Sequence, residues 1–456
     1  MGEAATTMAT LISTTARTVV VGLGTTGLAV ARHLHRSGRD FCVVDTRDVP
    51  PGLVEMQAEM PEVPLLLGSV PQNVLSTAGE LIVSPGIAPT EKWLQEAVAA
   101  GATLRSDIDL FMDAARAPVV GITGSNGKST VTELVGAMAR NAGRRVAVGG
   151  NLGTAALDLL DDDCELYVLE LSSFQLELSG SLGLSVATVL NVTPDHLDRH
   201  GDMPRYHQAK HRIFRSCDTV VFHRDDVLTI PPQIDGQRSI SWCVGEPDLQ
   251  GYGLRQDGDE RFIARGAELL MPVRDLALPG EHNLGNALAA LALGEAAGLP
   301  RAAMLETLGC FRGLPHRCET VLERDGVRWI NDSKATNVGA ALAAIEGLGA
   351  TSRVLLIAGG RDKDSDFRTL GEAVRRHCDA VFLIGEATEA LATALDGCSE
   401  LIDAGTLDQA VALAAARVQA GQVVLLSPAC ASFDQFRSFG ERGDAFRAAV
   451  AREVSP

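Results

Sequence analysis

Short apolar stretches alternate with longer segments of helical periodicity along the whole chain. Three clear examples are residues 18–22 followed by 26–38, 118–124 followed by 128–143, and 353–360 followed by 367–377. Strands that alternate with helices in this way are typical of β-α units, in which helices cover both faces of a mostly parallel sheet. The pattern therefore predicts an α/β protein.

The pattern divides into three blocks, each of which opens on a strand. We predict a flexible extension over 1–16, an N-terminal Rossmann-like domain over 17–106, a central P-loop ATPase-type domain with a mostly parallel sheet over 107–313, and a C-terminal Rossmann-like domain over 314–456. Residues 103–117 are expected to form a helix-containing crossover. Residues 248–270 have poor helical periodicity and predict a small strand-rich excursion.

The first strand leads into the glycine pattern G-x-G-x-x-G at Gly22, Gly24 and Gly27. Such glycines let the backbone approach a pyrophosphate at the start of the next helix. Asp45 ends the next strand, eighteen residues after Gly27, where an acidic residue would contact an NAD ribose. Taken alone, this block predicts a dinucleotide and hydride transfer.

A second glycine-rich loop changes that interpretation. The stretch VVGITGSNGKST places Gly124 and Gly127 before Lys128 and Ser129, between a strand and a helix. This arrangement suits a nucleoside triphosphate: amides hold phosphate oxygens, the lysine reaches the β- and γ-phosphates, and the hydroxyl is offered to Mg²⁺. The strict P-loop pattern would require glycine where Ile122 stands. The alternative is an ordinary strand-turn-helix with a solvated lysine, but hydride transfer needs no second loop of this kind.

Four further residues are candidates for metal binding or catalysis. Glu170 ends an apolar strand, where it would hold Mg²⁺ or cap the following helix. His196 and His200 stand four residues apart and would suit a zinc pair, although no third ligand is evident; His196 is otherwise a loop histidine without a role. Lys210 lies in a helical stretch and, by composition alone, is a solvated lysine.

Composition limits the function classes. The formal net charge of −18 argues against nucleic acid as a partner. The nine cysteines include no C-x-x-C pair, which favours reduced thiols. No apolar stretch approaches the ~18 residues needed to span a bilayer, and the start lacks the pattern of a signal peptide. We therefore expect a cytoplasmic protein without membrane insertion.

Several long motifs carry a family resemblance. They are TGSNGKST, LELSSFQLE, NVTPDHLDRH, LPGEHNLGNALAALAL, LPHRCE, NDSKATNVGA, AGGRDKDSDF and SPACASFDQFRSFGERG. From about residue 17 to about residue 450 the chain resembles the Mur ligase superfamily, and within it the glutamate-adding ligases of bacterial peptidoglycan synthesis. The resemblance implies an ATP-dependent ligase, here expected as a monomer. It would join the carboxylate of UDP-N-acetylmuramoyl-L-alanine to the amine of D-glutamate through an acyl phosphate.

The resemblance also implies roles for single residues. ATP would be bound by Gly124, Asn126, Gly127, Lys128, Ser129, Thr130, Asn283, Asn286, Arg317 and Asp332. The UDP-sugar would be bound by Gly24, Thr25, Thr26, Asp45, Thr46, Arg47, Gly86 and Asn151. The amino acid would be bound by Thr336, Lys363, Ser432 and Phe439. Two Mg²⁺ ions would be bound by Ser129, Glu170, His196 and Lys210.

Three of these residues would take part in catalysis: Lys128, His196 and Lys210. Lys210 matches the family lysine that takes up CO₂ to become a carbamate, an anionic oxygen ligand. That reaction needs a lysine whose ammonium form is disfavoured, which burial would supply. His196 is the candidate for the group that accepts the proton of the attacking amine.

Three alternatives remain open at this stage. In folylpolyglutamate synthase, which also adds glutamate, the phosphate loop lies near the start of the chain, whereas here about a hundred residues precede it. Another muramyl ligase is disfavoured by SPACASFDQF and by the absence of an Asp-Asn-Pro-Arg motif. A non-enzymatic ATP-dependent switch would bind nucleotide without turnover.

Overall fold

The structure is a computed structural model that describes residues 17–70, 72–232, 236–278, 280–362 and 365–454. The predicted extension 1–16 and Lys363 lie outside the described residues. The described chain forms two compact units. The first contains the residues up to Thr123, with Arg144–Ala187 and Gln208–Thr219; the second contains Gly124–Gly143, Thr188–His207 and the residues from Val220 onward.

The first sheet has five parallel strands in the order β3-β2-β1-β4-β5. Its strands are β1 (Thr18–Val21), β2 (Phe41–Asp45), β3 (Leu65–Leu67), β4 (Glu80–Val83) and β5 (Thr103–Arg105). The helices between them are α1 (Thr25–Arg36), α2 (Leu53–Glu59), α3 (Gln72–Leu75) and α4 (Lys92–Ala99). The strand order reverses at β1, so the loops that follow β1 and β4 leave on opposite sides of a crevice suited to a ligand.

The second sheet has nine strands in the order β14-β13-β12-β11-β10-β9-β6-β8-β7. They are β6 (Val119–Thr123), β7 (Val146–Gly150), β8 (Leu166–Glu170), β9 (Val186–Val189), β10 (Thr219–His223), β11 (Arg238–Trp242), β12 (Tyr252–Asp257), β13 (Glu260–Arg265) and β14 (Glu268–Pro272). The α-helices of this region are α5 (Asp107–Ala114), α6 (Lys128–Asn141), α7 (Ser173–Leu178), α8 (Leu197–His200), α9 (Met203–His211), α10 (Glu281–Ala296) and α11 (Arg301–Cys310). The short 3-10 helices are η1 (Ala156–Leu159), η2 (Arg212–Phe214) and η3 (Val273–Asp275).

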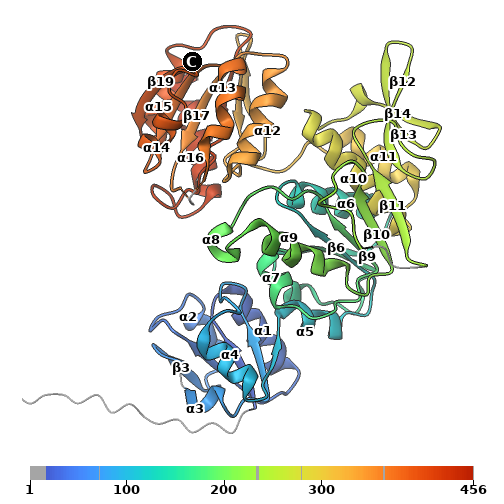
Figure 1. Ribbon diagram of the computed structural model, residues 1–456, viewed down its shortest axis with the longest axis vertical. Helices are drawn as coiled ribbons and strands as arrows, with labels where there is room; N and C mark the ends of the chain where they lie inside the picture. Colours follow the sequence, from blue (N-terminus) through green and yellow to red (C-terminus); the bar gives the residue numbers. More distant parts are fainter. Residues whose placement is uncertain (1–16, 71, 233–235, 279, 363–364, 455–456) are drawn as a thin grey trace, which may run out of the picture. The chain divides into compact units, whose positions relative to one another are not determined.

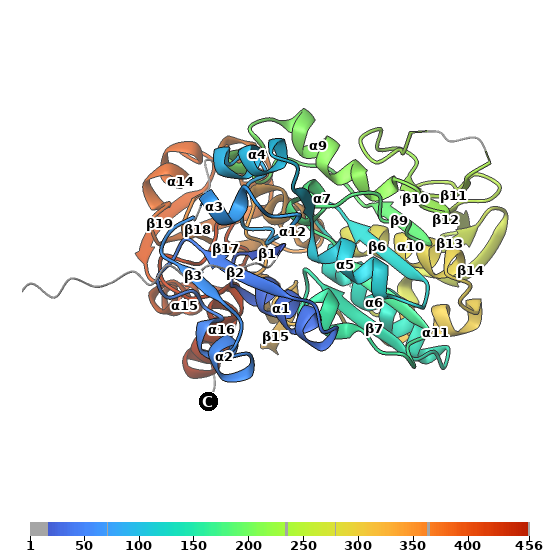
Figure 2. The same cartoon turned by 90° about the horizontal axis from the view of Figure 1, so that it is seen from below.

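Two sequence predictions for this region are confirmed. The stretch 103–117 contains β5 and α5. The stretch 248–270 contains the antiparallel strands β12 and β13 and the start of β14 (Figure 1, Figure 2). These strands need no helical crossover because tight turns join them, which is why helical periodicity is missing there.

The third sheet has six strands in the order β15-β16-β20-β17-β18-β19. They are β15 (Glu319–Arg324), β16 (Val327–Asn331), β17 (Val354–Gly359), β18 (Cys378–Ile384), β19 (Glu400–Gly405) and β20 (Val423–Leu426). The helices are α12 (Val338–Gly349), η4 (Phe367–Leu370), α13 (Gly371–His377), α14 (Thr388–Ala394), α15 (Leu407–Ala415) and α16 (Phe439–Val454). All neighbouring pairs are parallel except β15 with β16, and β20 lies between β16 and β17.

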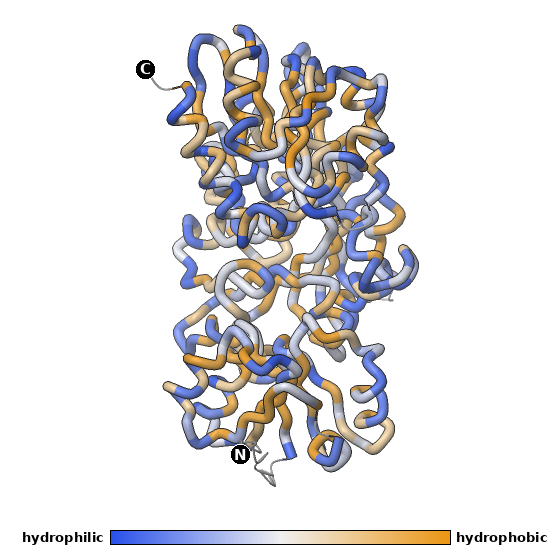
Figure 3. Tube along the Cα trace, turned by 90° about the vertical axis from the view of Figure 1, so that its left-hand side faces the viewer, coloured by the Kyte–Doolittle hydropathy of each residue, from blue (hydrophilic) through white to orange (hydrophobic). Residues whose placement is uncertain are grey.

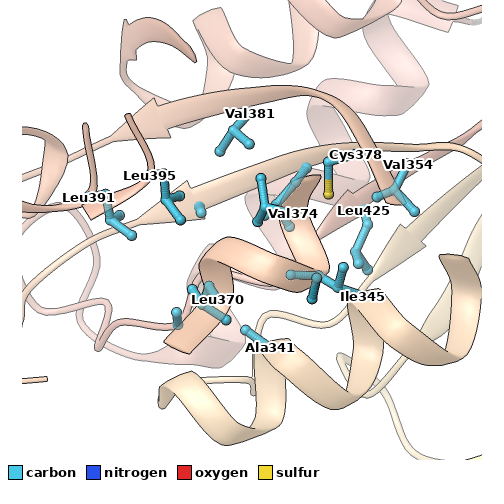
Figure 4. Packing of buried hydrophobic residues seen from close by; sticks show 14 of the residues in the cluster. Ala341, Ile345, Val354, Leu370, Val374, Cys378, Val381, Leu391, Leu395 and Leu425 are labelled. Carbon is cyan, nitrogen blue, oxygen red and sulfur yellow. The ribbon is translucent and has the colours of Figure 1, made fainter. Parts of the chain in front are cut away.

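Alternate residues of the third sheet pack on opposite faces. Leu356 belongs to a cluster with Ile345 of α12 and Val374 of α13, and Figure 4 labels the latter two. Its neighbour Ile357 belongs to a second cluster with Phe446 of α16. Figure 3 shows that hydrophobic stretches alternate with hydrophilic stretches along the chain. Burial on both faces explains why these strands read as continuous apolar runs.

The three sheets bear out the predicted α/β fold with three domains and mostly parallel strands. Each sheet lies within one predicted domain, while the boundaries at 106/107 and 313/314 stay predictions. The nine cysteines are thiols that form no disulfide with one another, as expected. None of the helices in the described ranges has the length and apolar character that crossing a membrane requires.

Candidate functional site

The second glycine-rich loop, between β6 and α6, is held in place by the segment that follows β9. The amides of Ser125 and Asn126 donate to the main-chain and side-chain oxygens of Asn191, at 2.9 and 2.8 Å. Ser125 Oγ donates to the carbonyl of Thr193 at 2.9 Å and lies 3.0 Å from the hydroxyl of buried Tyr206. These hydrogen bonds hold the loop in one conformation. Binding of a ligand therefore costs little additional loss of conformational entropy in the loop.

The last residue of this loop must be glycine. The side chain of the lysine that follows it points back toward the loop. Gly127 precedes α6 with φ +80°, and a Cβ there would lie 2.5 Å from Asn286 Oδ1. The Nζ of Lys128 donates to the carbonyls of Gly124 and Ser125, at 2.9 and 3.0 Å. The ammonium group can exchange these oxygens for phosphate oxygens, while the first amides of α6 and its dipole favour the same anion.

Other residues expected at ATP come together near this loop in the second unit. Ser129 and Thr130 are buried in the first turn of α6, and Arg317 Nη2 donates to Ser129 Oγ. Asn286 Nδ2 donates to Asn283 Oδ1 at 3.1 Å. The structure thus places a guanidinium and two amide side chains next to the phosphate loop, although their roles stay predictions.

Asp332, also expected at ATP, is a buried carboxyl at the carboxyl end of β16. Its oxygens accept hydrogen bonds from Ser427 Oγ at 2.8 Å and from the amide of Cys318 at 3.1 Å. Burial raises the pKa of Asp332 to about 7, because the loss of hydration outweighs these hydrogen bonds and the attraction of Arg317. The carboxyl joins the loops after β16 and β20.

Asn337 is a residue that sequence reasoning missed. Its Oδ1 caps α12 by accepting from the amide of Ala340 at 2.8 Å. Its Nδ2 donates to Asn126 Oδ1 at 3.3 Å and to Asp195 Oδ2 at 3.2 Å. An asparagine before an apolar helix predicts the cap. Its contacts with residues more than a hundred positions earlier carry no local signal.

Of the candidate metal ligands, Glu170 and Lys210 belong to the first compact unit and are almost completely buried. Glu170 is 3% exposed at the end of β8, and Asn151 Nδ2 donates to its Oε1 at 2.6 Å. Asn151, expected at the UDP-sugar, therefore also orients this carboxylate. Lys210 is 2% exposed on α9. This is the burial that the carbamate hypothesis requires.

His196 belongs to the second unit and directly precedes α8, in a left-handed conformation with φ +54°. Its amide donates to Asp195 Oδ1 at 3.0 Å, and its ring Nε2 lies 3.6 Å from Asp195 Oδ2. His200 is instead buried beside the ring of Tyr206, at 5.3 Å between centroids. Within the described ranges, no three or more His, Cys, Asp or Glu side chains are placed to hold a metal, so the zinc pair gains no third ligand.

Seven of the eight residues expected at the UDP-sugar, all except Asn151, lie at the carboxyl ends of β1, β2 and β4. They are Gly24, Thr25 and Thr26 at the start of α1, Asp45, Thr46 and Arg47 after β2, and Gly86 after β4. A Cβ at Gly27 would lie 1.8 Å from the carbonyl oxygen of Gly22, so α1 can approach β1 this closely only with glycine. Ser84 Oγ donates to the same carbonyl at 3.1 Å.

The side chain of Asp45 holds the first glycine-rich loop in place. Its carboxylate accepts from the amide of Leu23 at 2.7 Å, and from the amide, Nε and Nη2 of Arg47 at 2.9, 2.9 and 2.7 Å. Burial alone would raise the pKa of Asp45, but the bonds from Arg47 and the two amides outweigh it and lower the pKa to about 2. The carboxylate is therefore saturated by the protein, while half of the Arg47 side chain remains exposed.

Three residues expected at the amino acid lie in loops of the third sheet. Thr336 follows β16, Ser432 follows β20, and Phe439 opens α16. Ser333 Oγ donates to the carbonyl of Phe439 at 2.8 Å, and Lys334 Nζ lies 4.3 Å from the centroid of its ring. Lys363, the fourth, lies outside the described residues.

Comparison with known proteins gives consistent matches along the chain. Family models match at 16–106 (Mur ligase MurD-like, N-terminal domain), 122–294 (Mur ligase middle domain) and 316–430 (Mur ligase, glutamate ligase domain). The UDP-N-acetylmuramoylalanine--D-glutamate ligase of Pseudomonas putida is 53% identical over 95% of this chain and 96% of its own length. The ligase of the same name from Pseudomonas aeruginosa is 52% identical over 95% and 97%.

Solved structures agree in fold. The UDP-N-acetylmuramate-alanine ligase MurC of Thermotoga maritima aligns with a TM-score of 0.60 at 19% identity, covering 96% of this chain and 99% of its own. The MurF ligase of Thermotoga maritima in complex with ADP aligns with a TM-score of 0.60 at 18% identity, covering 96% and 94%. The near full-length identity to the Pseudomonas enzymes, with the three family-model matches, shows that the chain belongs to the Mur ligase family, in the branch of the UDP-N-acetylmuramoylalanine--D-glutamate ligases.

Proposed function

We propose that this protein uses ATP to join the carboxylate of UDP-N-acetylmuramoyl-L-alanine to the amine of D-glutamate, releasing ADP and phosphate in the synthesis of peptidoglycan precursors. The observation that carries the proposal is 53% identity, over 95% of the chain, to a ligase named for this reaction. The match of residues 16–106 to a MurD-like N-terminal domain favours this reaction over that of folylpolyglutamate synthase.

The phosphate loop would perform the activating step. A carboxylate is a poor acylating agent, so the γ-phosphate of ATP is transferred to it and gives an acyl phosphate. Lys128 and Arg317, which both lie at this loop, would neutralise the charge that spreads over the phosphate oxygens. The amine of glutamate then attacks the acyl carbon, and phosphate leaves from the tetrahedral intermediate. The protein supplies position and charge rather than covalent chemistry.

Magnesium would be held by the hydroxyl of Ser129, the carboxylate of Glu170, the ring of His196 and a carbamate on Lys210. The donor set fits a hard cation, because the buried Glu170 carboxylate and the Ser129 hydroxyl offer oxygen ligands. When bound, two Mg²⁺ ions would supply charge neutralisation at the phosphates. When its ring is not bound to the metal, His196, whose side chain is about one third exposed, would instead accept the proton of the attacking amine.

The first and third sheets would bind the other two substrates. The exposed guanidinium of Arg47 and the start of α1 are suited to the diphosphate of the UDP-sugar. Thr336, Lys363, Ser432 and Phe439 would surround the glutamate. We propose that the enzyme acts as a monomer in the cytoplasm, which size-exclusion chromatography and cell fractionation would test.

Phosphate release tests the proposed reaction. The purified chain is incubated with ATP, Mg²⁺, UDP-N-acetylmuramoyl-L-alanine and D-glutamate, and each component is omitted in turn. We expect release that depends on both co-substrates, with L-glutamate much less active than D-glutamate. Nucleotide binding without such release would instead indicate a switch module, and release with folate substrates would indicate the other ligase.

The carbamate hypothesis has a separate test. Lys210→Ala should lose most of the activity and regain part of it with added short carboxylates, which can take the place of the carbamate oxygens. Lys92→Ala is the matched control, because the Lys92 side chain is 90% exposed. Full activity of Lys210→Ala would remove the carbamate from the mechanism.

A further inference from the structure

The start of α16 carries a buried arginine that the proposed mechanism does not use. Arg442 is 1% exposed. Its Nε donates to Ser333 Oγ at 3.0 Å and its Nη2 to the carbonyl of Ser333 at 2.8 Å. Its Nη1 and Nη2 also donate to the carbonyls of Ala431 and Cys430, at 3.3 and 3.1 Å. One guanidinium therefore joins the loop after β16 to the loop after β20.

Among the described residues no carboxylate forms a direct ion pair with this guanidinium; Asp434 and Asp332, and the thiol of Cys430, act on its charge only from a longer distance. Its four hydrogen bonds end on neutral oxygens, three of them main-chain carbonyls. Burial lowers the pKa of Arg442 to about 10, because hydration of the cation is lost, so the group still carries its charge at neutral pH. A buried cation without a counter-ion is costly, and well-packed neutral side chains often replace buried ions without loss of stability. The fold alone gives little reason for a charge here.

The loop after β17 reaches the same place. Gly360 has φ +132°, and a Cβ there would lie 2.2 Å from the carbonyl of Ala431 and 3.1 Å from Arg442 Nη1. Arg361 and Ala431 exchange main-chain hydrogen bonds of 2.9 and 3.0 Å. Arg442 thus lies where the carboxyl ends of β16, β20 and β17 meet, which are neighbours in the sheet. Ligands bind at such edges in open α/β sheets.

The residues proposed for the amino acid stand on these same loops. Ser432 follows Ala431 directly, and Thr336 lies three positions after Ser333. Phe439 is tied in through Ser333, whose Oγ donates to its carbonyl while accepting from Arg442. The hydroxyl groups proposed for a substrate with two carboxylates therefore stand on the loops that this buried positive charge joins.

We propose that Arg442 is a positioning and specificity residue for the amino-acid substrate. It holds the loops that carry Thr336, Ser432 and Phe439 in fixed positions relative to one another. Its charge attracts the dicarboxylate substrate from a distance, without direct contact. This inference rests on the proposed ligase function and adds a residue to its amino-acid subsite. Because a field acts at a distance in a low-dielectric interior, the effect should fall on the anionic amino acid more than on ATP, which the second glycine-rich loop binds.

The experiment compares Arg442→Met, Arg442→Gln and Arg442→Lys with the wild type. KM for each of the three substrates and kcat are measured by phosphate release, with thermal unfolding of each variant alongside. The matched control is Arg324→Gln, because Arg324 Nη1 also ties α16 to the sheet, through the carbonyl of Val454 at its far end. We expect the neutral variants to raise KM for D-glutamate at least about tenfold, equivalent to about 1.4 kcal/mol. KM for ATP should stay within about twofold, and Arg324→Gln should change stability only.

Arg442→Lys keeps a charge that can be titrated, so it tests the field separately from the fold. Its KM for D-glutamate should be near that of the wild type at pH 7 and rise relative to the wild type as the pH approaches 9.5, since a buried ammonium loses its proton more readily than a guanidinium. If the neutral variants do not fold, the pH dependence of KM in Arg442→Lys tests the inference by itself.

Two results would overturn the inference: parallel changes in KM for all three substrates, or a Lys variant with the pH profile of the wild type. Inactivity of the wild type with these substrates would refute the proposed function instead, so the two failures are distinguishable.

Discussion

Replacing Asp45 by asparagine should destabilise the first sheet by an amount that depends on pH. The pKa of this carboxyl is lowered from 3.8 to about 2. At 1.36 kcal/mol per pH unit this difference corresponds to about 2 kcal/mol of stability at neutral pH. Charge-assisted hydrogen bonds, such as those from Arg47, contribute about 1.5–3 kcal/mol each, which agrees in scale.

The sign follows from the two pKa values. The folded-state pKa lies below that of the unfolded chain, so the carboxylate stabilises the fold above the unfolded value. That stabilisation is lost as the pH falls from about 5 to about 2, and roughly half of it remains near pH 3. Asparagine keeps the shape and one acceptor oxygen but has no charge to titrate, so the variant should not follow this profile.

Hydrogen exchange read by mass spectrometry provides the assay, because it reports local opening in a chain of several domains. Peptides covering β1 and β2 of Asp45→Asn should exchange about 30-fold faster than those of the wild type at pH 7, and less than about tenfold faster at pH 3, after correction for intrinsic rates. Asp48→Asn, in the exposed part of the same loop, should exchange as the wild type does. The reasoning would be refuted if Asp45→Asn exchanged faster than the wild type by the same factor at both pH values, or no faster than the wild type at pH 7.

Three further outcomes follow from the geometry. Gly127→Ala should abolish binding of a fluorescent ATP analogue, because its Cβ would lie 2.5 Å from Asn286 Oδ1 at φ +80°; binding as tight as that of the wild type would contradict this. Tyr206→Phe should lower the free energy of unfolding by about 1 kcal/mol through loss of its bond to Ser125, which urea titration would measure. Phe446→Ala should cost about 3–5 kcal/mol in the same titration, because its fully buried ring fills one face of the third sheet; a change below 1 kcal/mol would show that the cluster repacks.

Much of the fold could be predicted because its signals are local. A strand, a glycine-rich turn and a helix lie within about fifteen residues at both glycine-rich loops, so backbone chemistry alone indicates them. Glu170 and Asp45 could be placed at strand ends for the same reason. The burial of Lys210 could not be foreseen, since its helix has no strong apolar face in sequence. Only the family resemblance marked this residue as a candidate.

The hydrogen-bond partners that the site residues have within the protein could not be predicted from the sequence. The sequence predicts Asp45 as a ligand of a ribose or a UDP-sugar, but gives no sign that its carboxylate accepts hydrogen bonds from Leu23 and Arg47. The contacts of Asn337 and Arg442 join residues about 10 to 210 positions apart. Such contacts depend on how the strands are ordered in the sheet, and strand order leaves no periodic trace in the chain.

The placement of β20 has a consequence for the synthesis of the protein. This strand is the last of its sheet to leave the ribosome, yet it is an inner strand, because it separates β16 from β17. A growing chain that has not reached residue 426 can already form the phosphate loop, but β16 and β17 then lack the neighbour that joins them. Domains that finish earlier can fold first during translation, whereas this sheet must wait. A prematurely terminated chain would therefore lack both the strand that joins β16 to β17 and the following loop, which carries Ser427 and Ser432.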